Sequence, residues 1–229
     1  MRNFKIIGLT GPTGSGKGVV AEYLASKGFK VIDADKIVRK VTSPNTVCLK
    51  TLSSAFGSEI LNSDNSLNRK TLAKIAFSTK ENTQLLNDIT HPFVYLEVLK
   101  LVDEYIKNGC TNIVYDAPLL FESNGHIMCD YTISVLCPQN VRMERIINRD
   151  NITEQQAQSR INAQHNDDYY IKRCDFTINN NSSLENLYKQ TEDILKKIWF
   201  KRWNHWHKEE GITENQALED FYLNFLLGL

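Results

Sequence analysis

The chain has 229 residues, long enough for one domain with insertions and a substantial core, and no apolar stretch in it reaches the length of a bilayer span. Lysine plus arginine and aspartate plus glutamate number 27 each, so the zero net charge argues against a general affinity for nucleic acid. The five cysteines are scattered and form no C-x-x-C pair, which disfavours both disulfides and a zinc site. Because the sequence also shows no signal segment, we expect a cytoplasmic protein without membrane attachment.

The first predicted element is a strand that leads into a phosphate-binding loop. An apolar run over 4–10 precedes Gly11, Gly16 and Lys17 at the spacing of a Walker A motif, and a helical run over 19–26 follows. Loop amides and a helix N-terminus bind phosphate oxygens, and the lysine reaches the β- and γ-phosphates. The sequence therefore predicts a nucleotide-phosphate site formed by Gly11, Pro12, Thr13, Gly14, Ser15, Gly16, Lys17, Gly18 and Val19.

Gly18 departs from this motif. Walker A loops carry serine or threonine at this position, and the hydroxyl binds Mg²⁺. Because Mg²⁺ normally keeps several water ligands, a water molecule can replace that hydroxyl. The loop therefore predicts nucleotide binding and leaves the way the metal is held open.

Five strand-like runs recur along the chain, with helical patterns between them. They cover 4–10, 30–34, 111–117, 131–137 and 176–179, and several are apolar throughout, as in strands that are covered on both faces. This alternation predicts an α/β fold of the P-loop NTPase type, with three layers around a parallel five-stranded sheet. The nucleotide-binding core is expected to comprise 1–35, 109–140 and 169–200.

A first insertion, 36–108, is helical almost throughout. One helix is expected after Ser66, and one or two more between Glu81 and Lys107, with Pro92 at a start or a kink. His91, beside that proline, has the alternative of capping the helix that follows.

A second insertion, 141–168, is polar, and Thr153 with Gln156 predicts a capping box within it. Arg142, Arg145 and Arg149 share one face of a predicted helix, with Arg160 further on. Guanidinium groups suit phosphate oxygens, so this insertion is interpreted as a lid. The alternative is a solvated basic face paired with neighbouring carboxylates. Residues 201–229 are predicted to form a C-terminal helical extension.

Carboxylates follow the second and third strands. Asp33 and Asp35 close the second strand and Asp116 ends the third, at the sheet edge where ligands of open α/β folds bind. Asp33 is the candidate base for a hydroxyl that attacks the γ-phosphate, and Asp33 and Asp116 are candidate metal ligands. Asp35 has the equal alternative of a helix N-cap. Glu122 adds a further carboxylate, with a solvated loop charge as its alternative.

Taken together, these motifs resemble those of dephospho-coenzyme A kinases, which are P-loop kinases similar to nucleoside monophosphate kinases. Over residues 4–195 the chain carries, in order, the glycine-rich loop, Asp33-Ala-Asp35, Leu67-Asn-Arg69, Ile89-Thr-His91-Pro92, Asp116-Ala-Pro-Leu-Leu-Phe-Glu122 and Arg145…Arg149…Arg160-Ile…Gln164. The resemblance implies phosphorylation of the ribose 3′-hydroxyl of dephospho-coenzyme A, with ATP as donor and Mg²⁺ as cofactor.

The resemblance also implies roles for individual segments and residues. The insertion 36–108 would bind the acceptor, and 141–168 would close over the nucleotide as the lid. Catalysis would rest on Lys17, Asp33, Arg145 and Arg149. Acceptor binding would rest on Asp35, Arg69, His91, Asp116 and Leu119.

Two other functions compete with this interpretation. The chain is either another P-loop kinase that phosphorylates a nucleotide or other small molecule, or a regulator that binds a nucleotide without catalysis. Gly18 is the feature that favours the regulator, and the identity of the acceptor separates the two kinases. The oligomeric state does not follow from the sequence.

Overall fold

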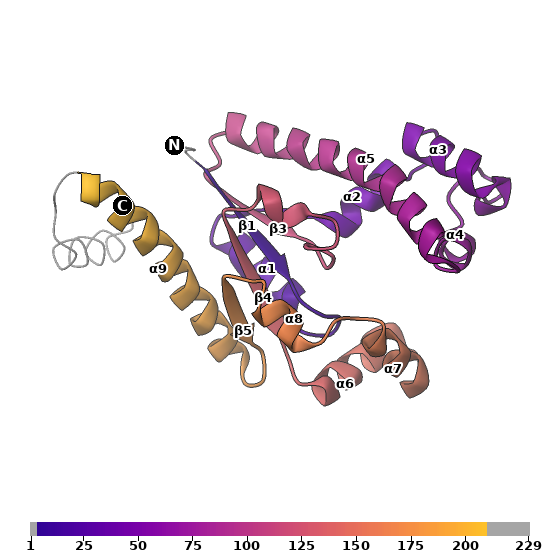
Figure 1. The fold of residues 1–229 in the computed structure, drawn as a ribbon. Helices are drawn as coiled ribbons and strands as arrows, with labels where there is room; N and C mark the ends of the chain where they lie inside the picture. The colour runs from indigo at the N-terminus through magenta and orange to yellow at the C-terminus, as the bar shows by residue number, and fades with distance from the viewer. Residues whose placement is uncertain (1–3, 210–229) are drawn as a thin grey trace.

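The computed structural model describes residues 4–209, with side chains through residue 199, and its strands form a parallel five-stranded sheet (Figure 1). The strand order is β2-β3-β1-β4-β5. The bounds are Lys5–Thr10 for β1, Lys30–Asp33 for β2, Asn112–Asp116 for β3, Tyr131–Leu136 for β4 and Phe176–Asn179 for β5. The predicted strands and the parallel α/β fold are confirmed, each strand end within one residue.

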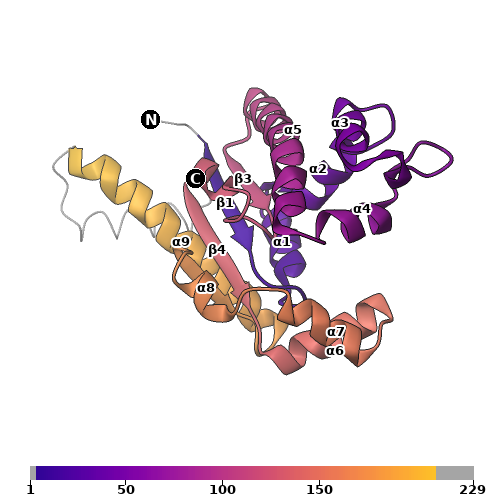
Figure 2. The ribbon, with the colours of Figure 1, turned by 45° about the vertical axis from the view of Figure 1, so that its right-hand side comes forward.

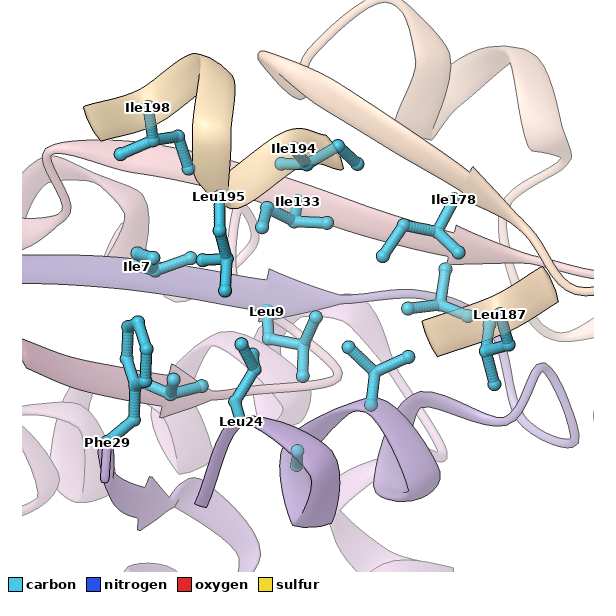
Figure 3. Packing of buried hydrophobic residues seen from close by; sticks show 14 residues of the cluster. Ile7, Leu9, Leu24, Phe29, Ile133, Ile178, Leu187, Ile194, Leu195 and Ile198 are labelled. Atoms are coloured by element: carbon cyan, nitrogen blue, oxygen red, sulfur yellow. The ribbon is translucent and has the colours of Figure 1, made fainter. Parts of the chain in front are cut away.

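Helices cover both faces of the sheet, which gives three layers. On one face, α1 (Lys17–Ser26) and α9 (Leu184–Glu209) pack on β1 through Ile7 and Leu9, and Figure 3 shows Leu24 and Leu187 in this cluster. On the other face, Ile6 belongs to a second cluster with α2 (Ala34–Val41) and α5 (Lys80–Lys107). Neighbouring residues of β1 therefore serve opposite layers, as the period of a strand requires.

The first insertion is helical, as predicted. It contains α2, α3 (Val47–Phe56), the short 3₁₀ helix η1 (Ser58–Ile60), α4 (Arg69–Ala76) and α5. These helices lie together on one side of the sheet in Figure 2. They bury a small core of their own, formed by Cys48, Leu52, Phe56, Ile60, Leu72 and Ala76.

α5 is one continuous helix, and Pro92 lies inside it rather than at its start. Capping of α5 by His91 is therefore wrong, because Thr79 is the N-cap and His91 is interior. Side chains on both sides of Pro92 are packed: Ile89, before it, packs against the core of the insertion, and Val98, after it, lies in the core beneath the sheet. This burial along the helix outweighs the loss of the proline's backbone hydrogen bond.

The second insertion comprises α6 (Gln139–Asp150) and α7 (Glu154–Asn162), followed by α8 (Asp167–Ile171). α6 and α7 lie side by side beyond the sheet (Figures 1 and 2). The capping box is confirmed: the Thr153 hydroxyl accepts from the Gln156 amide, and the Gln156 side chain accepts in return.

α9 continues to Glu209, across residue 200, where the core was predicted to end. The remainder of the predicted C-terminal extension lies outside the described residues. Between residues 4 and 209, no helix is both long enough and apolar enough to cross a membrane.

Candidate active site

The phosphate-binding loop joins β1 to α1, and its glycines are sterically required. Gly11 and Gly16 have positive φ angles of 145° and 94°. A Cβ at Gly11 would overlap the Val135 carbonyl oxygen, and a Cβ at Gly16 would overlap the Asn180 amide. The loop therefore takes a path that side chains at these two positions would block.

Three side chains from distant segments hold the loop. Asn180 Nδ2, beyond β5, donates to the Ser15 carbonyl at 2.7 Å. Arg145 Nη1 donates to the Gly14 and Ser15 carbonyls at 3.3 and 3.4 Å, and the Thr13 amide donates to Gln164 Oε1 at 2.9 Å. Sequence reasoning gave Asn180 and Gln164 no role, although Gln164 belongs to the pattern shared with the kinases.

We expect Asn180→Ala to lower the free energy of unfolding by about 1–3 kcal/mol, because it removes a hydrogen bond to a buried carbonyl. Asn180 is 6% exposed, and its bond to Ser15 is the shortest of those that hold the loop. Urea denaturation measures the change. Asn179→Ala is the control, because the Asn179 side chain is exposed and its bonds to Gln190 use backbone atoms. Equal losses in the two variants would contradict the assignment.

Gly18, by contrast, is not sterically required. It lies in the first turn of α1, is exposed, and a Cβ built there meets no atom within 4 Å. Packing therefore does not explain the missing hydroxyl, and a serine would fit.

The predicted carboxylates lie around Lys17. Its ammonium pairs with Asp116, which is 8% exposed, and Asp116 is the register partner of Asp33 across β2 and β3. Burial raises the pKa of Asp116 although Lys17 lies against it, and the charges of Asp33 and Asp35 raise it further. The carboxylates of Asp33, Asp35 and Asp116 outnumber the two ammonium groups paired with them, those of Lys17 and Lys36, so this edge of the sheet carries an excess of negative charge that a cation would relieve.

Asp33, not Asp35, caps α2. Asp33 Oδ1 accepts from the Lys36 amide at 3.0 Å, and Oδ2 lies 3.6 Å from Lys36 Nζ. The alternative that Asp35 is the N-cap is wrong, because β2 ends at Asp33, the last residue with an extended backbone. Asp35 falls in the first turn of α2 and is exposed.

The arginines of the second insertion occupy different environments. Arg145 contacts the phosphate-binding loop, and Arg142 is buried. Arg149 is exposed and donates to both Asp150 oxygens, at 2.8 and 3.0 Å, and Arg160 pairs with the same carboxylate. Arg149 first, and then Arg160, lower the pKa of Asp150 to about 2. The alternative of a solvated basic face paired with carboxylates therefore describes Arg149 and Arg160. Arg145 instead lies at the loop, where a side chain that binds phosphate is expected.

The remaining acceptor candidates are spread over three elements. Arg69 Nη2, at the start of α4, donates to the Thr42 hydroxyl at 3.1 Å. His91 is half-buried in α5, and burial lowers its pKa. Leu119 is 62% exposed in the turn after β3. For residues 4–199, no hydrogen bond or ion pair joins these three to the carboxylates around Lys17.

Known proteins resemble the chain along most of its length. A family model described as dephospho-CoA kinase matches residues 5–186. A dephospho-CoA kinase of Listeria monocytogenes is 39% identical over 194 residues, with 85% of this chain and 97% of the relative covered. One of Fusobacterium nucleatum is 41% identical over 193 residues, covering 84% and 98%. The solved dephospho-CoA kinase of Campylobacter jejuni gives a TM-score of 0.62 at 28% identity, covering 86% and 98%. Because the family model spans most of the chain, the chain belongs to the dephospho-CoA kinase family.

Proposed function

We propose that the chain transfers the γ-phosphoryl group of ATP to the ribose 3′-hydroxyl of dephospho-CoA, giving CoA and ADP. The observation that carries the proposal is the Lys17–Asp116 pair beside Asp33, at the mouth of the phosphate-binding loop. Membership of the family supplies the acceptor. Together they favour a kinase over a regulator that only binds nucleotide.

In the proposed reaction, Asp33 takes the proton of the 3′-hydroxyl as the hydroxyl oxygen bonds to the γ-phosphorus and ADP leaves. Asp33 Oδ1 is committed to the α2 cap, so Oδ2 is the atom proposed to receive the proton. Lys17 turns from Asp116 to the β- and γ-phosphates, and the loop amides hold the other phosphate oxygens. Positioning and charge neutralisation carry this chemistry.

The two insertions are proposed to serve acceptor and donor. Residues 36–108 bind dephospho-CoA through Asp35, Arg69 and His91, with Asp116 and Leu119 contributed by β3 and its exit turn. Residues 141–168 close as the lid, with Arg145 already at the loop. Arg149 is proposed to leave Asp150 for the transferring phosphate when the lid closes, because phosphate accepts the same pair of guanidinium donors.

Mg²⁺ is the proposed cofactor, and the donors near Lys17 fit it. Carboxylate oxygens are ligands that Mg²⁺ prefers, and Asp33 and Asp116 would hold it, directly or through water. Among the side chains of residues 4–199, no three acidic, histidine or cysteine groups gather closely enough to hold a metal by themselves. This fits a metal that arrives with the phosphates and keeps several waters. When bound, Mg²⁺ neutralises charge on the transferring phosphate.

We expect Gly18→Ser to lower the Mg²⁺ concentration for half-maximal turnover by less than about threefold, because phosphates and waters supply most ligands. The serine fits without displacing an atom. Titration of Mg²⁺ in a coupled ADP assay measures the effect. Gly18→Ala is the control, since it adds the Cβ and the helix propensity without a hydroxyl. A gain of about tenfold or more in Gly18→Ser alone would mean that the native loop is compromised as a metal site.

The acceptor is tested by an ADP-release screen of dephospho-CoA against nucleoside monophosphates and nucleosides, each at several Mg²⁺ concentrations. We expect release that depends on dephospho-CoA and far exceeds release with the other compounds. Preference for a nucleotide would favour the rival kinase. Tight ATP binding without release for any acceptor would favour the regulator.

The cytoplasm is the proposed location. All five cysteines are free thiols in the structure, and Cys48 and Cys137 are buried. Unpaired thiols are typical of a reducing compartment.

A further inference from the structure

Glu122 connects the exit of β3 to the end of the lid. It lies in the turn between β3 and the 3₁₀ helix η2 (Gly125–Met128). Glu122 Oε1 is 3.1 Å from His165 Nε2, and His165 lies between α7 and α8. The Glu122 side chain is 30% exposed, so it is not a fully solvated loop charge. The contact joins two segments that are far apart in the sequence.

Tyr169 in α8, just beyond the lid, faces the same carboxylate. Its ring stacks on His165 at 3.6 Å with an interplanar angle of 10°. Phe121 approaches the Tyr169 ring edge-on at 6.3 Å, and the Arg173 guanidinium lies 4.0 Å from its centroid. Burial raises the pKa of Tyr169, and the charge of Glu122 and a hydrogen bond to it act in the same direction.

The residue before His165 is attached to the phosphate-binding loop. Gln164 Oε1 accepts from the Thr13 amide, as described above. Residues 164–169 are here called the return segment. Two adjacent side chains fix it: Gln164 binds the phosphate-binding loop, and His165 contacts Glu122. α6 and α7, which carry Arg145, Arg149 and Arg160, precede this segment.

We infer that Glu122 is a positioning residue that fixes the return segment, and through it places the lid arginines over the phosphate-binding loop. This inference rests on the proposed function, in which the lid closes on ATP. Glu122 touches side chains of the return segment rather than reacting atoms, so it is not a catalytic residue. A return segment fixed beforehand reduces the conformational freedom that is lost when the lid closes, and this favours nucleotide binding and transfer.

The test compares Glu122→Ala with Glu192→Ala. Glu192 is a matched control because it also accepts a hydrogen bond from a tyrosine hydroxyl (Tyr23) and one from a cationic side chain (Lys27). Its side chain is 39% exposed. It joins α1 to α9, away from the lid. Glu122→Gln keeps an acceptor oxygen and tests rescue. His165→Ala removes the partner from the lid side, and the double variant Glu122→Ala/His165→Ala tests coupling.

Two measurements are made on each variant. The first is limited trypsin digestion of the ligand-free protein, with the cuts after Arg149 and Arg160 mapped by mass spectrometry. The second is the determination of kcat and of KM for ATP. We expect Glu122→Ala to raise both the cleavage rate at these sites and the KM for ATP by about tenfold, the equivalent of one or two lost hydrogen bonds. Glu192→Ala should match the wild type in both, and Glu122→Gln should lie between. The double variant should be no worse than Glu122→Ala.

Unchanged cleavage in Glu122→Ala, or equal changes in Glu122→Ala and Glu192→Ala, would overturn the inference. Additive effects of Glu122→Ala and His165→Ala would also overturn it, because the two residues would then act independently. If Glu122→Ala does not fold, His165→Ala and Glu122→Gln give the same readouts. The digestion needs no acceptor, so its result stands even if the wild type fails to phosphorylate dephospho-CoA, which would refute only the proposed function.

Discussion

Replacing Lys17 with methionine lowers kcat/KM for phosphorylation of dephospho-CoA by about 10³-fold, the largest loss that we expect from a single substitution. Lys17 is the ammonium that the structure places at the loop, paired with the buried Asp116. Methionine matches the unbranched stem of lysine up to Cε and removes the ammonium that would neutralise the β- and γ-phosphates. Steady-state ADP release, measured at saturating ATP with the dephospho-CoA concentration varied, gives the loss.

A control must separate this loss from unfolding, because methionine leaves the buried Asp116 without a partner. Breaking a buried ion pair in this way lowers the free energy of unfolding by about 3–5 kcal/mol. Lys17→Arg keeps a cation beside Asp116 and should unfold near the wild-type denaturant midpoint. Its planar fork does not replace a compact ammonium, so turnover should still fall. Turnover of Lys17→Met within about tenfold of wild type would rule out the proposed role of Lys17.

Asp33→Asn is the second large effect, and we expect turnover to fall by about 10²–10⁴-fold with ATP affinity nearly unchanged. The amide cannot take the proton of the attacking hydroxyl. It can still cap α2, because asparagine is as good an N-cap as aspartate, so the bond to the Lys36 amide is retained. The measurements are single-turnover phosphoryl transfer and binding of a fluorescent ATP analogue.

Asp33→Ala shows why the asparagine variant is the informative one. Alanine removes the base and the cap together, and the lost cap costs about 1 kcal/mol in addition. Asp33→Asn should therefore unfold like the wild type, and Asp33→Ala earlier. Wild-type turnover in Asp33→Asn would refute the base assignment and leave the carboxylate as a helix cap.

The sequence predicted what depends on local pattern. The strands were found because both of their faces are buried, so Ile6 and Ile7 are both apolar although they face opposite layers. The phosphate-binding loop was found because Gly11 and Gly16 stand where the backbone cannot admit a side chain. Asp33 and Asp116 were expected at one sheet edge because both end parallel strands, and the register pairs them.

The sequence did not predict what depends on contacts between distant segments. Asn180 beneath Ser15 and Glu122 beside His165 are ordinary polar residues until the fold brings their partners together. Arg149 shows a different limit: one spacing suits both a phosphate ligand and a surface pair, and in the structure Arg149 pairs with Asp150. The exact start of α2 decided which aspartate caps it, and the cap is Asp33, two residues before Asp35.

The most direct test of the central claim is to identify the phosphorylated product. The chain is incubated with ATP, Mg²⁺ and dephospho-CoA, and the acceptor is analysed by mass spectrometry and ³¹P NMR. Our account predicts a product heavier by one phosphoryl group, with the new monoester on the ribose 3′-oxygen and one ADP formed for each product. Dephospho-CoA recovered unchanged while ATP is bound, or phosphate on any other oxygen, would contradict the account.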